Sequence, residues 1–186
     1  MPHMPTDTMF LLPYTPRADA DARGYDEWIQ SIDNPFFNSV DGISHYSNWK
    51  VRDVLVGSVP FTHFDFMFVD RERQAKIWSN EAVAAFANGW TEKWGVDPGN
   101  ADLSVNYHVY KLAHREGPVV FDREHVLVVF EPASPRGADA SSWSVEESVL
   151  GKCPCASVEI LFGDAARARD LNGALAAFTG ELIAAP

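Results

Sequence analysis

The sequence has few cysteines, no long apolar run and no N-terminal export signal. Two of the 186 residues are cysteine, Cys153 and Cys155. A disulfide framework needs more cysteines at wider spacing, so this usage predicts a reducing, cytoplasmic compartment. No stretch approaches the ~18 apolar residues of a membrane-spanning helix. The N-terminal segment MPHMPTDTMF also lacks a basic region followed by an apolar one. We therefore expect no membrane partner.

Basic residues are scarce as well. The chain has 15 Lys and Arg against 26 Asp and Glu, which leaves a net charge of −11. Such a charge repels the phosphates of nucleic acids, so nucleic acid is not an expected partner. The sequence also has no glycine-rich phosphate loop, no dinucleotide-binding fingerprint and no G-x-S-x-G elbow. These absences disfavour nucleotide cofactors and serine hydrolysis, and we expect no cofactor.

The residues that are abundant favour a packed core. Hydrophobic residues make up 46% of the chain and include six Trp, enough for one well-packed domain. The stretch FTHFDFMFVD alternates with the period of a β-strand, so residues two apart share a face. One face carries Phe64, Phe66 and Phe68, and the other carries His63 and Asp65 side by side. A polar pair opposite so apolar a face is the clearest candidate for a functional site.

Four segments have the pattern of a strand: 8–14, 43–56, 61–70 and 103–114. Apolar residues at helical spacing predict two helices between them. One covers 24–33 and should end at Asn34-Pro35, because the residue before a proline disfavours helical geometry. The other should be capped by Ser79 and should end at Gly95.

The resulting order is strand, helix, strand, strand, helix, strand. This order predicts an α+β, ferredoxin-like antiparallel sheet over 8–115, with both helices on one face. Residues 116–186 are expected to form a C-terminal β/α extension packed on the same domain. Its apolar segments lie at 125–132 and 155–163, and a final helix should begin near Asp164.

Two segments, DNPFFNSVDGISHY and WSNEAVAAFANGW, resemble the EthD-type group of dimeric α/β barrel proteins. The residues that carry the resemblance are Asp33-Asn34-Pro35, Asp41-Gly42 and Tyr46. Asp33 stands where that group commonly has His, and Asp41 where it commonly has Pro. The resemblance implies a homodimer in which two sheets pack face to face and enclose a pocket. The group contains cofactor-free monooxygenases, cyclases, decarboxylases and dehydratases, so it leaves the reaction open.

In such a dimer, Phe64, Phe66 and Phe68 would pack under the helices, while His63 and Asp65 would face the cavity. The same alternation places further side chains on the cavity face of the 103–114 strand: Asn106, His108 and Tyr110. The 43–56 strand has two candidate faces, one with His45 and Trp49 and one with Tyr46 and Asn48. We favour the face with His45 and Trp49.

These residues suggest acid–base chemistry. We expect His63, oriented by Asp65, to act as general acid or base, with His108 and Tyr110 polarising a substrate oxygen. The expected substrate-binding residues are His45, Trp49, Met67 and Asn106. The predicted activity is a cofactor-independent enzyme acting on a small aromatic or polyketide-like molecule, as a lyase, decarboxylase, cyclase, isomerase or cofactor-free monooxygenase.

Two alternatives stay open. The first is a non-catalytic dimeric module that binds a small apolar ligand or serves in a stress response. The second is a metal- or haem-dependent oxygenase on the same fold. His45, His63, His108 and Asp65 are suitable metal-ligand types, although their spacing matches no recognised metal motif.

Overall fold

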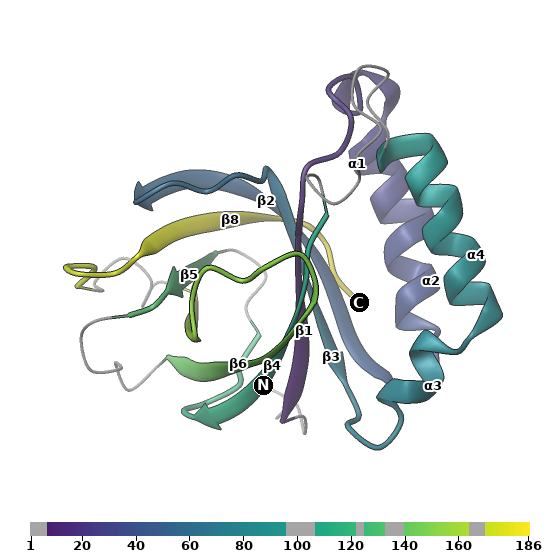
Figure 1. Ribbon diagram of the computed structural model, residues 1–186. Coiled ribbons are helices and arrows are strands. Elements are labelled where there is room, and N and C mark those ends of the chain that lie inside the picture. Colours follow the sequence, from purple (N-terminus) through teal and green to yellow (C-terminus); the bar gives the residue numbers. More distant parts are fainter. Residues whose placement is uncertain (1–6, 96–106, 122–124, 133–139, 164–169) are drawn as a thin grey trace.

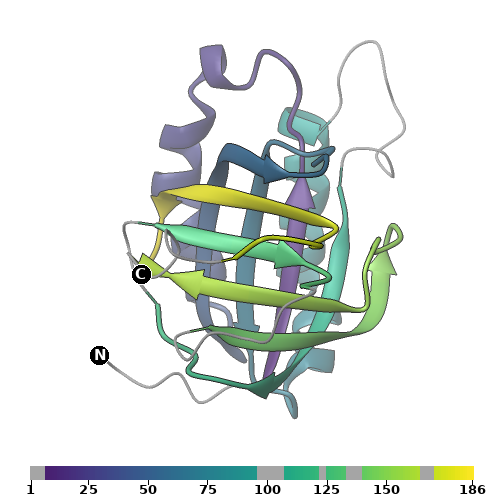
Figure 2. The same cartoon turned by 90° about the vertical axis from the view of Figure 1, so that its left-hand side faces the viewer.

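A computed structural model describes residues 7–95, 107–121, 125–132, 140–163 and 170–186. Eight antiparallel strands within them close into a barrel in the order β1-β3-β2-β8-β5-β7-β6-β4 (Figures 1 and 2). The strands are β1 Thr8–Tyr14, β2 Ile43–Val56, β3 His63–Val69, β4 Val109–Glu116, β5 Val126–Phe130, β6 Ser141–Leu150, β7 Ser157–Phe162 and β8 Ala176–Ala184.

The predicted fold class is wrong, because the sheet closes on itself. The expected order of strands and helices does occur as far as β4, and β4-β1-β3-β2 are neighbours. However, the outer strands β2 and β4 pair onward with β8 and β6, so the second half of the chain completes a barrel. The architecture is therefore neither a ferredoxin-like sheet nor an α/β barrel made by two chains.

Strand bulges explain how the barrel closes. β2 is 14 residues long, and it pairs with β3 over Ile43–Lys50 and with β8 over Asn48–Val56. Its pairing with β8 shifts register three times, and the β4–β6 pairing does the same. Each bulge bends a strand and increases its twist, so β2 and β4 turn the corners between the two halves of the barrel.

The predicted C-terminal helix is also wrong. Its N-terminal residue, Asp164, lies outside the described residues, and Ala176–Ala184 form β8. β8 pairs with both β2 and β5, and its backbone approaches the barrel interior closely. A Cβ atom on Gly180 would lie 2.5 Å from Phe64 Cζ, so this position needs a glycine. Pairing on both edges outweighs the local helical preference of the alanines.

The helices lie on one side of the barrel, against β1, β3 and the first half of β2 (Figure 1). They are α1 Tyr25–Trp28, α2 Asn34–Asn38, α3 Gln74–Trp78 and α4 Glu81–Trp90, with a 3-10 turn η1 Asp21–Arg23 and π-helical turns η2 Ile29–Asp33 and η3 Thr91–Gly95. Among the described residues, no helix has the length and apolar character needed to cross a membrane.

Two predicted helix boundaries differ from the structure. Pro35 does not end the first helix. η2 widens the turn before it, and Pro35 then lies near the start of α2, where a helix tolerates proline. Asn80, rather than Ser79, caps α4, and its Oδ1 accepts a hydrogen bond from the Ala82 backbone N–H at 2.9 Å.

β1 and β3 are buried on both faces, since one face looks into the barrel and the other looks at the helices. Phe64, Phe66 and Phe68 fill the barrel interior together with Trp49 and Phe178. The prediction that these three phenylalanines pack under the helices is therefore wrong. The face with the polar pair is the one that the helices cover.

Candidate functional site

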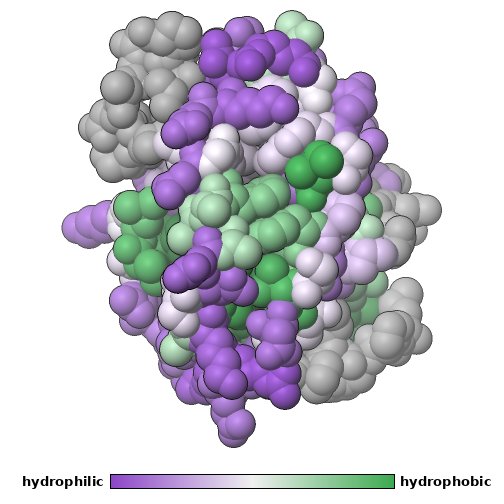
Figure 3. Space-filling model, turned by 90° about the vertical axis from the view of Figure 1, so that its right-hand side faces the viewer, coloured by the Kyte–Doolittle hydropathy of each residue, from purple (hydrophilic) through white to green (hydrophobic). Residues whose placement is uncertain are grey.

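A pocket of about 240 Å³ lies between the helices and the sheet. Most of its wall is apolar or aromatic: Leu12, Tyr14, Tyr25, Phe37, Tyr46, Met67, Trp78, Val83, Phe86, Ala87, Trp90, Tyr107, Val109 and Leu150. Trp78 and Leu150 are 44% and 41% exposed, so the pocket reaches the surface beside them. Figure 3 shows the helix-bearing face, where apolar side chains gather near the centre. An apolar cavity with a few convergent polar groups is the usual form of a small-molecule site.

Two carboxyl groups, those of Asp33 and Asp65, are the titratable acids of this wall. Asp33 is the last residue of η2 and Asp65 lies in the middle of β3. They are only 5% and 3% exposed. The widened π-helical turn presents Asp33 to the sheet, and such turns are frequent at functional sites.

Tyr46 and Asn48, neighbours on the helix-facing side of β2, bridge the two carboxyl groups. The Tyr46 hydroxyl lies 2.7 Å from Asp65 Oδ2 and 3.1 Å from Asp33 Oδ2. Asn48 Nδ2 lies 2.9 Å from Asp33 Oδ2 and 3.0 Å from Asp65 Oδ1. Each carboxyl group is therefore held by the same two side chains.

Counting hydrogens shows that this group retains a proton. The Tyr46 hydroxyl has a single hydrogen and can donate to one carboxylate only. The other close oxygen–oxygen contact then needs a hydrogen of its own, which a protonated Asp33 or Asp65 supplies. Two buried carboxylates bridged by one hydroxyl are thus most stable when they share one proton.

Burial acts in the same direction. Loss of solvation raises the pKa of Asp33 to about 7, although the hydrogen bonds from Asn48 and Tyr46 oppose this shift. Burial, followed by repulsion from the Asp33 charge, raises the pKa of Asp65 well above its usual range. The pair therefore shares one proton at neutral pH, and the pKa of Asp33 lies near neutrality.

A chain of donors leads from α4 to the carboxyl pair. Trp90 Nε1 donates to the Tyr25 hydroxyl at 2.8 Å, and Tyr25 donates to the Tyr14 hydroxyl at 3.2 Å. The Tyr14 hydroxyl lies 3.5 Å from Asp65 Oδ1, which makes it the most weakly held member. Burial raises the pKa of both tyrosines, so their hydroxyls stay protonated. Tyr14 can accordingly turn its hydrogen toward a ligand.

Two asparagines of the first helical segment orient the bridging residues. Asn34 Nδ2 donates to Asn48 Oδ1 at 2.9 Å and to the Tyr46 carbonyl at 3.0 Å. This contact leaves the Asn48 amino group facing the carboxyl pair. Asn38 Oδ1 accepts from the Tyr46 backbone N–H at 2.9 Å. α2 thus fixes the side chains of β2 that hold the carboxyl groups.

His63 and Asp65 share a face as expected, but the structure does not pair them. His63 Nδ1 lies 2.9 Å from Thr62 Oγ1, and its ring stacks on Tyr14 behind the pocket wall. Burial lowers the pKa of His63 to about 4, so its imidazole is neutral at neutral pH. Asp65 and Met67 line the pocket, whereas His63 does not.

The other predicted site residues lie elsewhere. His45 contacts Phe121, at a ring distance of 4.3 Å, and Trp49 is part of the barrel interior. Tyr110 also points into the barrel, where its hydroxyl contacts the Lys152 carbonyl at 3.3 Å. His108 packs against Gly151, and Asn106 lies outside the described residues.

In the 43–56 strand and at residues 107–110 the side that faces the pocket is the opposite of the predicted one, whereas in β3 the predicted side, with Asp65 and Met67, does line the pocket. Tyr46 and Asn48 face the carboxyl groups, where His45 and Trp49 were expected. Tyr107 lines the pocket, where its neighbour His108 was expected. The missed residues share one sequence signal. Tyr and Asn stand at buried positions where an aliphatic side chain would suffice, and a buried polar group needs a partner.

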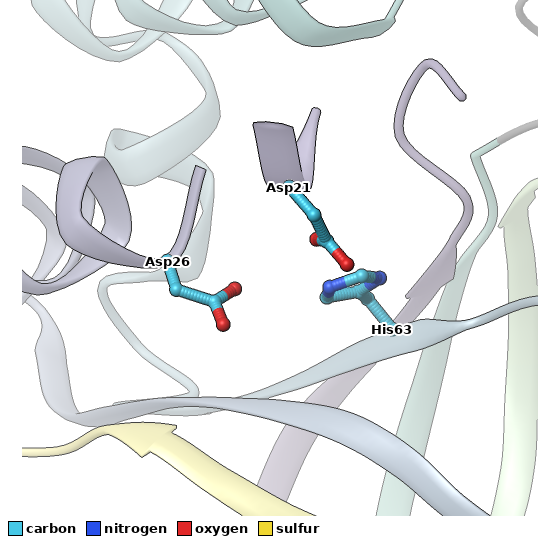
Figure 4. A group of neighbouring side chains, drawn as sticks. All are labelled: Asp21, Asp26 and His63. Atoms are coloured by element: carbon cyan, nitrogen blue, oxygen red, sulfur yellow. The ribbon is translucent and has the colours of Figure 1, made fainter. Parts of the chain in front are cut away.

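A second group of polar side chains lies behind the pocket wall. Asp21 of η1, Asp26 of α1 and His63 of β3 point toward one another (Figure 4), and one ligand-type atom from each lies within 4.8 Å of the others. This is the group among the described residues with the geometry to hold a metal ion. The set considered from the sequence, His45, His63, His108 and Asp65, is not brought together.

Comparisons with protein-family models, with curated proteins and with solved structures each found no match. The chemistry of the site is therefore the basis for assigning a function.

Proposed function

We propose that the protein is a cofactor-independent enzyme that moves a proton on a small, mostly apolar carbonyl compound. The observation that carries this proposal is the pair of buried carboxyl groups, Asp33 and Asp65, which share a proton at the wall of an apolar pocket. The proposal keeps the acid–base chemistry expected from the sequence and moves it from His63 to the carboxyl pair.

The raised pKa of Asp33 gives this carboxyl group its role in the proposed reaction. Asp33, with a pKa of about 7, is the base that takes a proton from a carbon beside the substrate carbonyl. The C–H electron pair then moves into an enolate, and Asp33 becomes a neutral acid. Returning that proton to the same carbon gives exchange, and returning it to a conjugated carbon gives isomerisation.

Developing charge on the substrate oxygen needs donors that are already in place. Tyr14 supplies a hydrogen at the pocket wall, and the Trp90–Tyr25 chain polarises the Tyr14 hydroxyl. The apolar residues around them exclude water, which strengthens each of these hydrogen bonds. A compact cyclic ketone fits both the volume and the polarity of the pocket.

Deuterium exchange tests the proposal directly. Cyclohexanone and 2-tetralone are incubated with the protein in D2O, and loss of the protons beside the carbonyl is followed by NMR. We expect catalysed exchange whose rate rises with pH through about 7, as Asp33 ionises. Asp33→Asn should lower this rate by at least about 100-fold, the usual contribution of a general base.

The matched control is Asp53→Asn, the same change at an exposed position of β2, and it should leave exchange unchanged. Binding is followed separately through the fluorescence of Trp78 and Trp90, both of which line the pocket. Binding without exchange would contradict the enzyme and favour the non-catalytic ligand-binding module. Neither binding nor exchange would contradict both. A cytoplasmic location and a homodimer remain predictions from the sequence.

A further inference from the structure

We propose that Asp21, Asp26 and His63 form a binding site for one divalent transition-metal ion, such as Zn²⁺, separate from the pocket. The carboxylates and the imidazole come from three different elements, η1, α1 and β3. Their ligand-type atoms lie within 4.8 Å of one another, a separation that a single ion at ordinary bond lengths can bridge. One nitrogen and two carboxylate ligands suit Zn²⁺ or Mn²⁺ better than Ca²⁺.

The state of His63 is the independent observation that points to a ligand. Its side chain is 2% exposed, and its Nε2 atom has no hydrogen-bond partner. A buried polar atom left without a partner is costly, and native proteins rarely keep one without a reason. In Figure 4 the imidazole faces the two carboxylates, so a bound cation would satisfy Nε2.

The neighbours of His63 prepare it to bind a metal. Nδ1 lies 2.9 Å from Thr62 Oγ1 and can donate its hydrogen there, which leaves the Nε2 lone pair for an ion. Metal-bound histidines are commonly oriented in this way by a hydrogen bond from their other nitrogen. Tyr14 and Tyr25 pack against the ring, at centroid distances of 5.5 and 5.6 Å, and hold it in place.

The carboxylates supply the charge that the ion needs. Asp26 Oδ1 is buried and has no hydrogen-bond partner, so a second ligand atom is free. Asp21 is exposed and forms an ion pair with Lys50, whose Nζ lies 2.8 Å from Asp21 Oδ2. A metal ion would compete with this ammonium group for Asp21. Removing Lys50 should therefore strengthen metal binding, whereas removing a ligand should weaken it.

Isothermal titration with ZnCl₂ tests the site in the full chain. The background carries Cys153→Ala and Cys155→Ala, because these thiols lie 3.7 Å apart and would bind Zn²⁺ themselves. We expect one ion per chain, an affinity loss of at least tenfold for Asp26→Asn or His63→Gln, and a gain of severalfold for Lys50→Met. The control Glu27→Gln removes an exposed acid of the same helix and should change the affinity little.

Circular dichroism confirms that each variant folds, and Co²⁺ absorption gives a second measurement. Visible d–d bands should appear on adding CoCl₂ and should be lost in Asp26→Asn. Absence of one-to-one binding, or equal losses in Asp26→Asn and Glu27→Gln, would overturn the site. Weaker binding by Lys50→Met would overturn the geometry proposed for Asp21. These measurements do not involve the ketone reaction, so either proposal can fail without the other.

Discussion

The two faces of β3 are equally buried but are built on opposite principles. Phe64, Phe66 and Phe68 look into the barrel, where packing alone holds the side chains. His63 and Asp65 look toward the helices, where a network of hydrogen bonds holds them. The apolar face contributes stability. On the polar face, keeping two carboxyl groups out of water lowers the stability. We infer that this difference marks the functional side of β3.

The largest expected effect comes from breaking the apolar face. Phe64 is fully buried, and its ring contacts those of Phe66 and Phe178. Phe64→Ala leaves a cavity in a packed barrel and should lower the free energy of unfolding by about 3–5 kcal/mol. Urea denaturation measures this. A loss below about 1 kcal/mol would mean that the interior is not packed as described.

The second effect is a dependence of stability on pH to which Asp33 contributes. The folded state raises the pKa of this carboxyl to about 7, whereas the unfolded chain keeps an ordinary value of about 4. Between these values the folded protein binds more protons, so the free energy of unfolding falls as pH rises from about 4 to about 7. The fall should be on the order of 2–4 kcal/mol.

Asp33→Asn should remove the part of this fall that Asp33 contributes, while Asp65, whose pKa is also raised by burial, keeps its own part. The variant should be more stable than wild type at pH values above about 7. The quantity to measure is the difference between the two proteins in urea denaturation across this range. His63, with its lowered pKa, has the opposite pH dependence in both proteins and cancels in the difference. Parallel curves for the two proteins would show that Asp33 is not a buried acid with a raised pKa.

A smaller effect is expected when the bridge between the carboxyl groups is removed. Tyr46→Phe keeps the ring and deletes the hydroxyl that contacts Asp33 and Asp65. It should lower the free energy of unfolding by about 1–3 kcal/mol, the cost of leaving buried polar groups without a partner. Tyr110→Phe is the matched control on the barrel side, since its hydroxyl contacts a backbone carbonyl at 3.3 Å. A larger loss in the control would contradict the importance assigned to the bridge.

The two faces also differ in how well the sequence predicted them. The alternation of residues 61–70 correctly separated the phenylalanines from His63 and Asp65. It did not say which side the helices cover, because a strand buried on both faces has the same pattern either way round. The answer depended on β8, whose residues Ala176–Ala184 have a helical composition and pair on both edges. Because the barrel closes, the side of β3 that carries the phenylalanines lies in the barrel interior.

Sequence periodicity by itself determined β1 and β2 with their observed bounds, a polar pair in β3, and a helix before and after the β2–β3 hairpin. These are local properties, set by the spacing of apolar side chains along a few turns or strands. Only the tertiary structure decided that Tyr46 and Asn48 bring Asp33 and Asp65 together. This arrangement joins a π-helical turn to a strand that lies 32 positions later in the sequence, and it depends on the docking of a helix against a closed barrel. No local pattern encodes the proximity of Asp33 and Asp65, because it arises from the packing of all the elements together.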